Sequence, residues 1–178
     1  FNGIEDIRNG IIRAVGMPDE RFKEDALRML RAIRFAAEKD FTIEIDTFNS
    51  IGRSNNLIKE ISYERIRDEL NRMLISANPL KLILLRDTKL LQHIIPELEI
   101  CFHTTQNHPH HIYNVGVHTV YSISNIESDR VLRWTMLLHD IGKPVVKCTD
   151  EYGIDRFHNH EIKSMELGEI ILKRLRFD

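Results

Sequence analysis

The stretch that most restricts how this chain can fold is Met136 to Lys143, an apolar helical run that ends in His139 and Asp140. Gly142 and then Pro144 follow, so the helix is expected to stop here. An imidazole and a carboxylate side by side at a helix end offer one nitrogen and one oxygen ligand to a divalent metal. The pattern therefore predicts helices that converge on this point, although a His-Asp pair can also be an ordinary surface dipeptide.

Two ligands are too few for a metal site, and other histidines are candidates for the rest. His118 lies in a helix expected over 114–126, and His158 and His160 precede a final helix expected over 162–175. His111 belongs to a histidine-rich loop and is a further candidate.

This ordered series resembles the HD superfamily of metal-dependent phosphohydrolases, whose tetrapeptide is intact as His139-Asp140-Ile141-Gly142. The resemblance implies a site of His118, His139, Asp140 and a fourth group that binds Mg, Mn, Ni or Fe. Where the family usually has Gly-His-Glu, this chain has Asn159-His160-Glu161, and the departure favours His160 over His158 as the fourth ligand.

Composition excludes several classes of protein. With 178 residues, 42% of them hydrophobic and 29% charged, the chain is expected to be soluble and globular, with one large or two small domains. No apolar run approaches the roughly 20 residues that span a bilayer, so we expect no membrane partner and a cytoplasmic protein. A net charge of -2 does not predict nucleic-acid binding, so any RNA contact must come from local clusters of Arg and Lys. Cys101 and Cys148 lack metal-site spacing and are expected to be small buried hydrophobes.

The first residues suggest a short β-hairpin. Two β-branched runs, 4–7 and 11–15, flank Asn9-Gly10, which favours a tight turn. Because an isolated hairpin is barely stable, it is expected to complete a sheet whose other strands are absent. The chain also begins at Phe1 without Met and ends within a helical pattern, and we interpret it as a piece of a longer protein.

A long amphipathic helix is predicted over 20–38, with one charged face. Asp25 and Arg28, three residues apart on this face, would place a carboxylate acceptor beside a fork of donors. Such a pair matches the amino group and neighbouring ring acceptor of cytosine and adenine, and it rejects guanine and uracil. A solvated helix face with internal ion pairs is the alternative interpretation.

The stretch from Arg21 to Ala36 is similar to the neck of CCA-adding tRNA nucleotidyltransferases and bacterial poly(A) polymerases, whose Glu-Asp-x-x-Arg motif is matched by Glu24, Asp25 and Arg28. The resemblance implies that these residues bind the nucleotide, with Asp25 and Arg28 reading CTP or ATP. It implies that Arg65, on a helix expected over 63–76, braces the reading helix. It also assigns Gly3 and Asp6 to a flexible hinge motif.

We therefore expect a mostly α-helical chain in three parts: the end of a nucleotidyltransferase head with its hairpin (1–16), a helical neck (17–95) and an HD domain truncated at its C-terminus (96–178). Further neck helices are expected over 46–57, capped by Asp46, and over 80–95, ended by Pro96.

The resemblance implies addition of CMP and AMP, from CTP and ATP, to the 3′ end of tRNA or another RNA. The Mg-binding carboxylates of the head are absent, so this piece alone is expected not to catalyse transfer. Two alternatives remain: the HD site acts as a phosphohydrolase on phosphomonoesters or cyclic phosphates, or it is a structural remnant. CCA addition and A addition are not separated, and neither is the oligomeric state.

Overall fold

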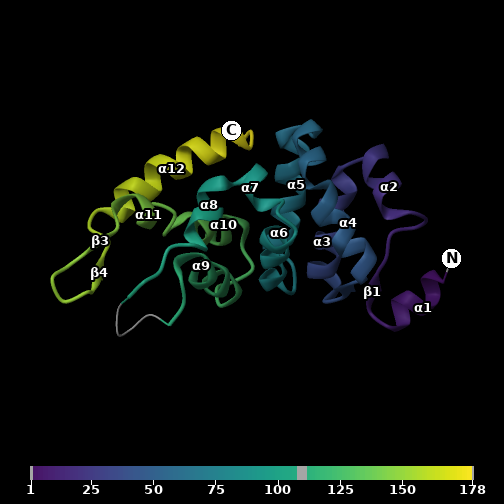
Figure 1. Cartoon of the computed structure of the whole chain (residues 1–178), viewed down its shortest axis with the longest axis horizontal. Helices are drawn as coiled ribbons and strands as arrows, with labels where there is room; N and C mark the ends of the chain where they lie inside the picture. The colour runs from purple at the N-terminus through teal and green to yellow at the C-terminus, as the bar shows by residue number, and fades with distance from the viewer. Residues whose placement is uncertain (1, 108–111, 178) are drawn as a thin grey trace. The chain divides into compact units, whose positions relative to one another are not determined.

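The computed structural model describes residues 2–107 and 112–177, and these residues are mostly helical, which confirms the predicted fold class. The chain divides into two compact units, Phe1–Ile94 and Ile95–Asp178 (Figure 1). Each unit is described by itself below. The functional assignment of the three expected parts stays a prediction.

The first unit is built around the helix pair α3 and α5. Helix α3 packs against α5, and its side chains Met29, Leu30 and Ile33 are fully buried. Met73 and Leu74 of α5 are fully buried as well, so this contact forms the core of the unit. The elements of the unit are α1 (Gly3–Arg8), β1 (Ile11–Ile12), α2 (Pro18–Glu24), α3 (Leu27–Lys39), β2 (Thr42–Ile43), α4 (Ile45–Ser54), η1 (Asn55–Glu60), α5 (Tyr63–Leu74), η2 (Pro79–Leu82), α6 (Ile83–Asp87) and α7 (Leu91–Ile94).

The predicted N-terminal hairpin is wrong. Residues 3–8 form helix α1, and acidic residues in its first turn and Arg8 in its last complement the helix dipole. Gly10, at φ +65°, turns the chain into β1, which pairs in parallel with β2. The partner strand is distant in sequence, so the local Asn-Gly signal was misleading.

The predicted helix over 20–38 is two helices. α2 ends at Glu24, Asp25 has extended backbone (φ -153°, ψ 103°), and α3 starts at Leu27. The Asp25 carboxylate accepts a hydrogen bond from the Leu27 backbone N–H (3.1 Å), so its side chain replaces the missing helical bond. Asp25 and Arg28 therefore do not lie on one helix.

Three other expected boundaries are corrected. Glu44, rather than Asp46, caps α4, because its carboxylate accepts from the Thr47 N–H at 2.8 Å. The run expected over 80–95 is divided into η2, α6 and α7, with Lys89 in the left-handed region at φ 62°. Pro96 begins helix α8 instead of ending a helix, which is the favoured first helical position for proline.

The second unit has helices where the sequence predicts them. Asn114 caps α9 and Asp129 caps α10 through their side chains, and the helix expected over 114–126 is present but ends at Ser124. The final helix starts two residues earlier than predicted, at His160, and a short helix and two short strands lie between α10 and α12. The elements are α8 (Pro96–Cys101), α9 (Val115–Ser124), α10 (Arg130–Leu138), α11 (Lys143–Val146), the antiparallel strands β3 (Cys148–Thr149) and β4 (Asp155–Arg156), and α12 (His160–Arg174).

Gly142 brings the end of α10 against α12. A Cβ atom on Gly142 would lie 2.5 Å from the Ser164 backbone nitrogen and 2.6 Å from the His160 carbonyl oxygen. The Gly142 N–H donates to the Ser164 hydroxyl at 2.9 Å. Within the described residues, no helix combines the length and apolar character of a membrane span.

Candidate functional site

Two clusters of predicted site residues are present, one in each unit. In the first, the Glu24 carboxylate lies 2.7 Å from Nη1 of Arg28 and 2.6 Å from Nη1 of Arg21. Arg28 also donates to the backbone carbonyl of Arg21 at 3.2 Å. The contacts lower the pKa of Glu24, chiefly through the bond from Arg28. Glu24 thus orients the guanidinium of Arg28.

Asp25 has a different partner. Its carboxylate lies 3.2 Å from Nη2 of Arg65, which is on α5. The predicted role of Arg65 as a brace of the reading helix stays a prediction. Arg28 lines a cavity of about 230 Å³ together with three other cations, Arg13, Arg21 and Arg31. Asp25 and Arg28, the two candidate reading residues, are both half-buried. Each is held by a different partner: Arg65 contacts Asp25, and Glu24 contacts Arg28.

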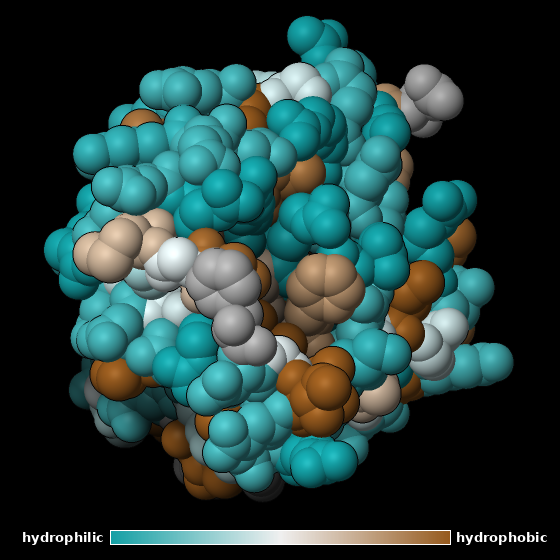
Figure 2. Space-filling view, turned by 90° about the vertical axis from the view of Figure 1, so that its right-hand side faces the viewer, coloured by the Kyte–Doolittle hydropathy of each residue, from teal (hydrophilic) through white to brown (hydrophobic). Residues whose placement is uncertain are grey.

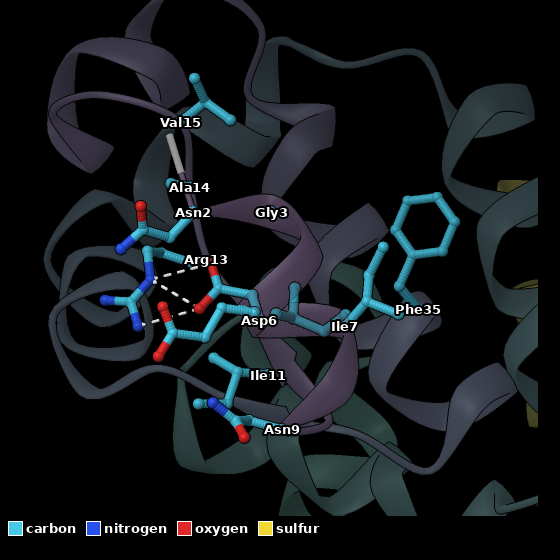
Figure 3. Close-up of a pocket in the computed structure, with 12 residues that line it drawn as sticks. Asn2, Gly3, Asp6, Ile7, Asn9, Ile11, Arg13, Ala14, Val15 and Phe35 are labelled. Atoms are coloured by element: carbon cyan, nitrogen blue, oxygen red, sulfur yellow. Dashed lines mark hydrogen bonds and ion pairs between the residues drawn. The ribbon is translucent and has the colours of Figure 1, made fainter.

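The hinge candidates lie on α1. Asp6 is joined to Arg13 by hydrogen bonds of 3.1 to 3.3 Å (Figure 3). Gly3 and Asp6 line a cavity of about 770 Å³, and Phe35 of α3 also lines it. Their role as a hinge stays a prediction.

The face of the molecule shown in Figure 2 is largely hydrophilic, with separate hydrophobic patches. The exposed apolar side chains of the N-terminal segment include Ile4 (72% exposed) and Ile7 (68%) on α1.

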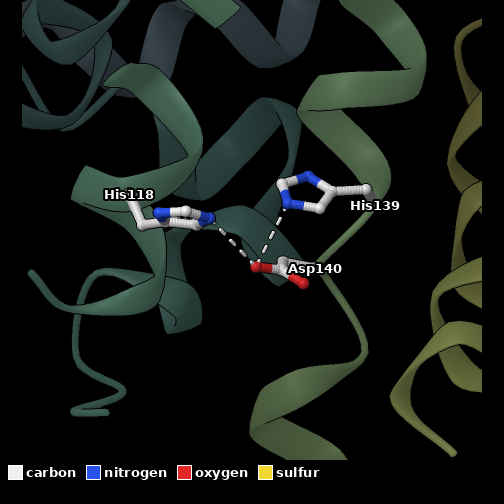
Figure 4. A group of neighbouring side chains, drawn as sticks. All are labelled: His118, His139 and Asp140. Atoms are coloured by element: carbon white, nitrogen blue, oxygen red, sulfur yellow. Dashed lines mark ion pairs between the residues drawn. The ribbon is translucent and has the colours of Figure 1, made fainter. Parts of the chain in front are cut away.

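In the second unit, His118, His139 and Asp140 converge, as Figure 4 shows. One potential ligand atom from each lies within 4.8 Å of the other two. α9 supplies His118, the C-cap of α10 supplies His139, and Asp140 follows it. Nε2 of His160 lies 3.5 Å from Oδ1 of Asp140, so the fourth candidate adjoins the group.

The other two histidine candidates have different outcomes. His158 is exposed in the turn before α12 and is not part of the cluster. His111 lies outside the described residues.

Asp140 is buried (3% exposed) and has cationic neighbours. Nζ of Lys143 lies 2.8 Å from its Oδ2, and Nε2 of His139 lies 3.2 Å away. Burial alone would raise the pKa of Asp140, but these two groups hold it well below its usual range. Burial would lower the pKa of His139, and contact with Asp140 outweighs that effect and raises it.

The donor set fits a divalent metal. Oδ2 of Asp140 is buried and faces Nε2 of His118 at 3.6 Å, Nε2 of His139 at 3.2 Å and Nζ of Lys143 at 2.8 Å. Nδ1 of His139 contacts the Met136 carbonyl oxygen at 2.7 Å, which leaves Nε2 directed toward Asp140. His118, His139, Asp140 and His160 would hold the ion.

Lys143 was missed as a site residue by the sequence analysis. Its ammonium is buried between Asp140 and the side-chain oxygen of Gln106, which it contacts at 2.8 Å. The signal was available in part, because Lys143 is three residues after Asp140 and both belong to the opening motif. Gln106 gave no signal, since its contact spans 37 residues.

Comparisons with known proteins bear on the family of the chain. Residues 40–101 match a family described as the probable RNA and SrmB-binding site of polymerase A. The CCA-adding enzyme of Ligilactobacillus salivarius is 53% identical over 79 residues, 44% of this chain and 20% of that protein. The A-adding tRNA nucleotidyltransferase of Deinococcus radiodurans is 32% identical over 187 residues, 99% of this chain and 43% of that protein. The chain thus spans about a fifth to two fifths of the length of these relatives.

Solved structures agree. The Bacillus stearothermophilus CCA-adding enzyme in complex with CTP is 27% identical to this chain. The superposition covers 97% of this chain and 40% of that enzyme's chain, with a TM-score of 0.62. The Thermotoga maritima CCA-adding enzyme complexed with tRNA superposes with a TM-score of 0.57, over 100% of this chain and 38% of that enzyme's chain. Because the two sequences are only 20% identical, this match shows the fold alone.

The helical fold and these matches define a part of a nucleotidyltransferase. The family is that of the CCA-adding enzymes and bacterial poly(A) polymerases, and the chain corresponds to a fragment of such a protein. The resemblance seen in the sequence is confirmed.

Proposed function

We propose that this chain selects the nucleotide in an enzyme that adds CMP and AMP, from CTP and ATP, to the 3′ end of tRNA. The observation that carries the proposal is the paired anchoring of the motif: Glu24 orients Arg28, and Arg65 contacts Asp25. A fixed carboxylate and a fixed guanidinium can discriminate bases by hydrogen bonding. The reaction and the RNA are taken from the CCA-adding and A-adding relatives described above.

The test uses the full-length enzyme that contains this chain and measures incorporation of all four nucleoside triphosphates. Asp25→Ala should remove the acceptor for the amino group, and the preference for C and A over U and G should fall by about 1 to 3 kcal/mol, or roughly 5- to 150-fold. Arg28→Lys should also reduce it, because an ammonium cannot replace the planar fork.

Lys23→Ala is the matched control, because Lys23 is an exposed cation on α2, next to Glu24. If Asp25→Ala and Arg28→Lys both keep the parent's base preference, these residues form an ordinary solvated face and the proposal is wrong.

A second function, that of a metal-dependent phosphohydrolase, is supported by the convergence of His118, His139, Asp140 and His160. A divalent metal bound there would lower the pKa of its water and polarise a phosphate. Lys143 would keep Asp140 ionised for ligation, and Met136 would keep the His139 ring in its ligating orientation.

We would assay the chain for hydrolysis of phosphomonoesters and 2′,3′-cyclic phosphates with Mg, Mn, Ni and Fe. His139→Ala should abolish the activity, and His103→Ala, an exposed histidine that contacts Glu99, should not. Metal binding without hydrolysis by the unmodified chain would favour a structural role.

A further inference from the structure

Three ion pairs connect α3, and Asp25 two residues before it, to α5, in the same order along both segments. Asp25 pairs with Arg65 at 3.2 Å, Arg34 with Glu69 at 2.6 Å, and Glu38 with Arg72 at 2.9 Å. We call these three pairs the charge ladder. The α5 partner is positive in the first pair, negative in the second and positive in the third. A shift of one helix along the other would therefore place like charges together.

The middle pair differs from the outer two in its burial. The Arg34 side chain is 2% exposed and that of Glu69 is 11% exposed, whereas Arg65 and Arg72 are 51% and 56% exposed. Arg34 also bonds Glu38 at 3.0 Å, and its guanidinium carbon lies 3.9 Å from the centre of the Phe35 ring.

Burial decides which pair sets the register of the two helices. Exposed ion pairs contribute little, whereas separating a buried pair leaves an uncompensated charge and is strongly unfavourable. One residue of helix rise is about 1.5 Å, which is enough to break the contact between Arg34 and Glu69. The middle pair therefore holds α5 at one position along α3.

That position determines where Arg65 lies. Arg65 is four residues before Glu69 on α5, so the two side chains emerge from the same helix face one turn apart. With Glu69 fixed on Arg34, Arg65 is presented to Asp25. The contact between Arg65 and Asp25 is too exposed to maintain this geometry alone.

We propose that Arg34 and Glu69 are positioning residues for nucleotide selection, acting through Arg65 on the carboxylate of Asp25. This inference rests on the proposed function, in which Asp25 reads the base. It adds two buried residues, remote from the base, on which fidelity depends.

The test measures the ratio of C and A incorporation to U and G incorporation by the full-length enzyme. Glu69→Gln removes the charge that holds Arg34, and the ratio should fall about tenfold, since misplacement of a positioning group by about 1 Å costs up to roughly a hundredfold. Asp68→Asn is the control: Asp68 is the neighbouring residue, pairs with Arg67 on the same helix, and is outside the charge ladder. Its ratio should equal the parent's.

A double variant distinguishes positioning from general damage. In an enzyme that already carries Asp25→Ala, Glu69→Gln should not lower the ratio further, because its effect passes through Asp25. If Glu69→Gln does not fold, Arg34→Lys, which keeps the buried charge and loses the fork, should lower the ratio about threefold.

A folded Glu69→Gln or Arg34→Lys with the parent's ratio, alongside a lowered ratio for Asp25→Ala, would overturn the inference and leave the proposed function standing. An unchanged ratio for Asp25→Ala would instead refute the proposed function, and the inference with it.

Discussion

Glu24 is the residue on which the orientation of Arg28 depends. Its carboxylate contacts two guanidiniums, that of Arg21 on α2 and that of Arg28 on α3. Because Glu24 is exposed, its ion pairs add little to folding, so their value is in orientation.

We expect Glu24→Gln to leave the thermal unfolding of the chain unchanged and to lower base selection by the full-length enzyme. Lys23→Gln, on the neighbouring residue, should change neither. A loss of thermal stability in Glu24→Gln without any change in selection would show that the residue is structural.

Gly142 is required by contact rather than by backbone conformation, since its φ is -82°. Gly142→Ala should lower the free energy of unfolding by about 2 to 4 kcal/mol, because the methyl group would overlap the backbone of α12. Gly168→Ala is the control: its methyl would meet only Leu138, at an ordinary 3.7 Å. That change should stabilise α12 by up to about 1 kcal/mol, and urea denaturation of the two variants would reveal the difference.

At the scale of elements, the break between α2 and α3 depends on Asp25. Its carboxylate takes the place of a helical acceptor for Leu27, so Asp25→Ala should cost about 1 kcal/mol of stability, and Asp25→Asn less, because an amide oxygen can still accept. Chemical denaturation of both variants measures this. Equal stability of Asp25→Ala and the unmodified chain would mean that the break needs no cap.

Helices α8 and α12 are connected by Glu97 and Arg174, with a hydrogen bond of 2.9 Å. Burial would raise the pKa of Glu97, but the bond from Arg174 lowers it overall from its ordinary value of 4.5. A carboxyl with a depressed folded-state pKa contributes stability above its unfolded pKa and loses it as the pH falls through the folded value.

We therefore expect Glu97→Gln to lower the free energy of unfolding by about 1 to 2 kcal/mol at pH 7. The difference from the unmodified chain should shrink once the pH drops below 4.5 and vanish below the folded pKa. Denaturation curves at several pH values would test this, and a difference that persists in strong acid would contradict it.

At the scale of the whole molecule, metal binding should couple to stability. A ligand that binds only the folded state stabilises it by about 2.7 kcal/mol at a hundred times its dissociation constant. Mn or Ni should therefore raise the unfolding temperature of the chain, and His118→Ala or His139→Ala should remove the shift while His103→Ala keeps it. An equal shift in all four proteins would place the metal elsewhere.

The sequence by itself determined the mostly helical class, the helix that begins after Asn114 and the helix that ends at His139. These features depend on residues within a turn or two of each other, where capping chemistry and helical spacing act directly. The family of the fragment was also readable, because its motifs are contiguous.

Only the tertiary structure decided the rest. α1 replaced a hairpin because the partner of β1 is about thirty residues away, and Asp25 interrupted a helix whose apolar spacing continued through it. Lys143 met Gln106 across 37 residues, and Arg34 met Glu69 across the α3–α5 core. Such contacts form only when packing removes the groups from water and makes a buried charge require its partner, and no local pattern records which partner that is.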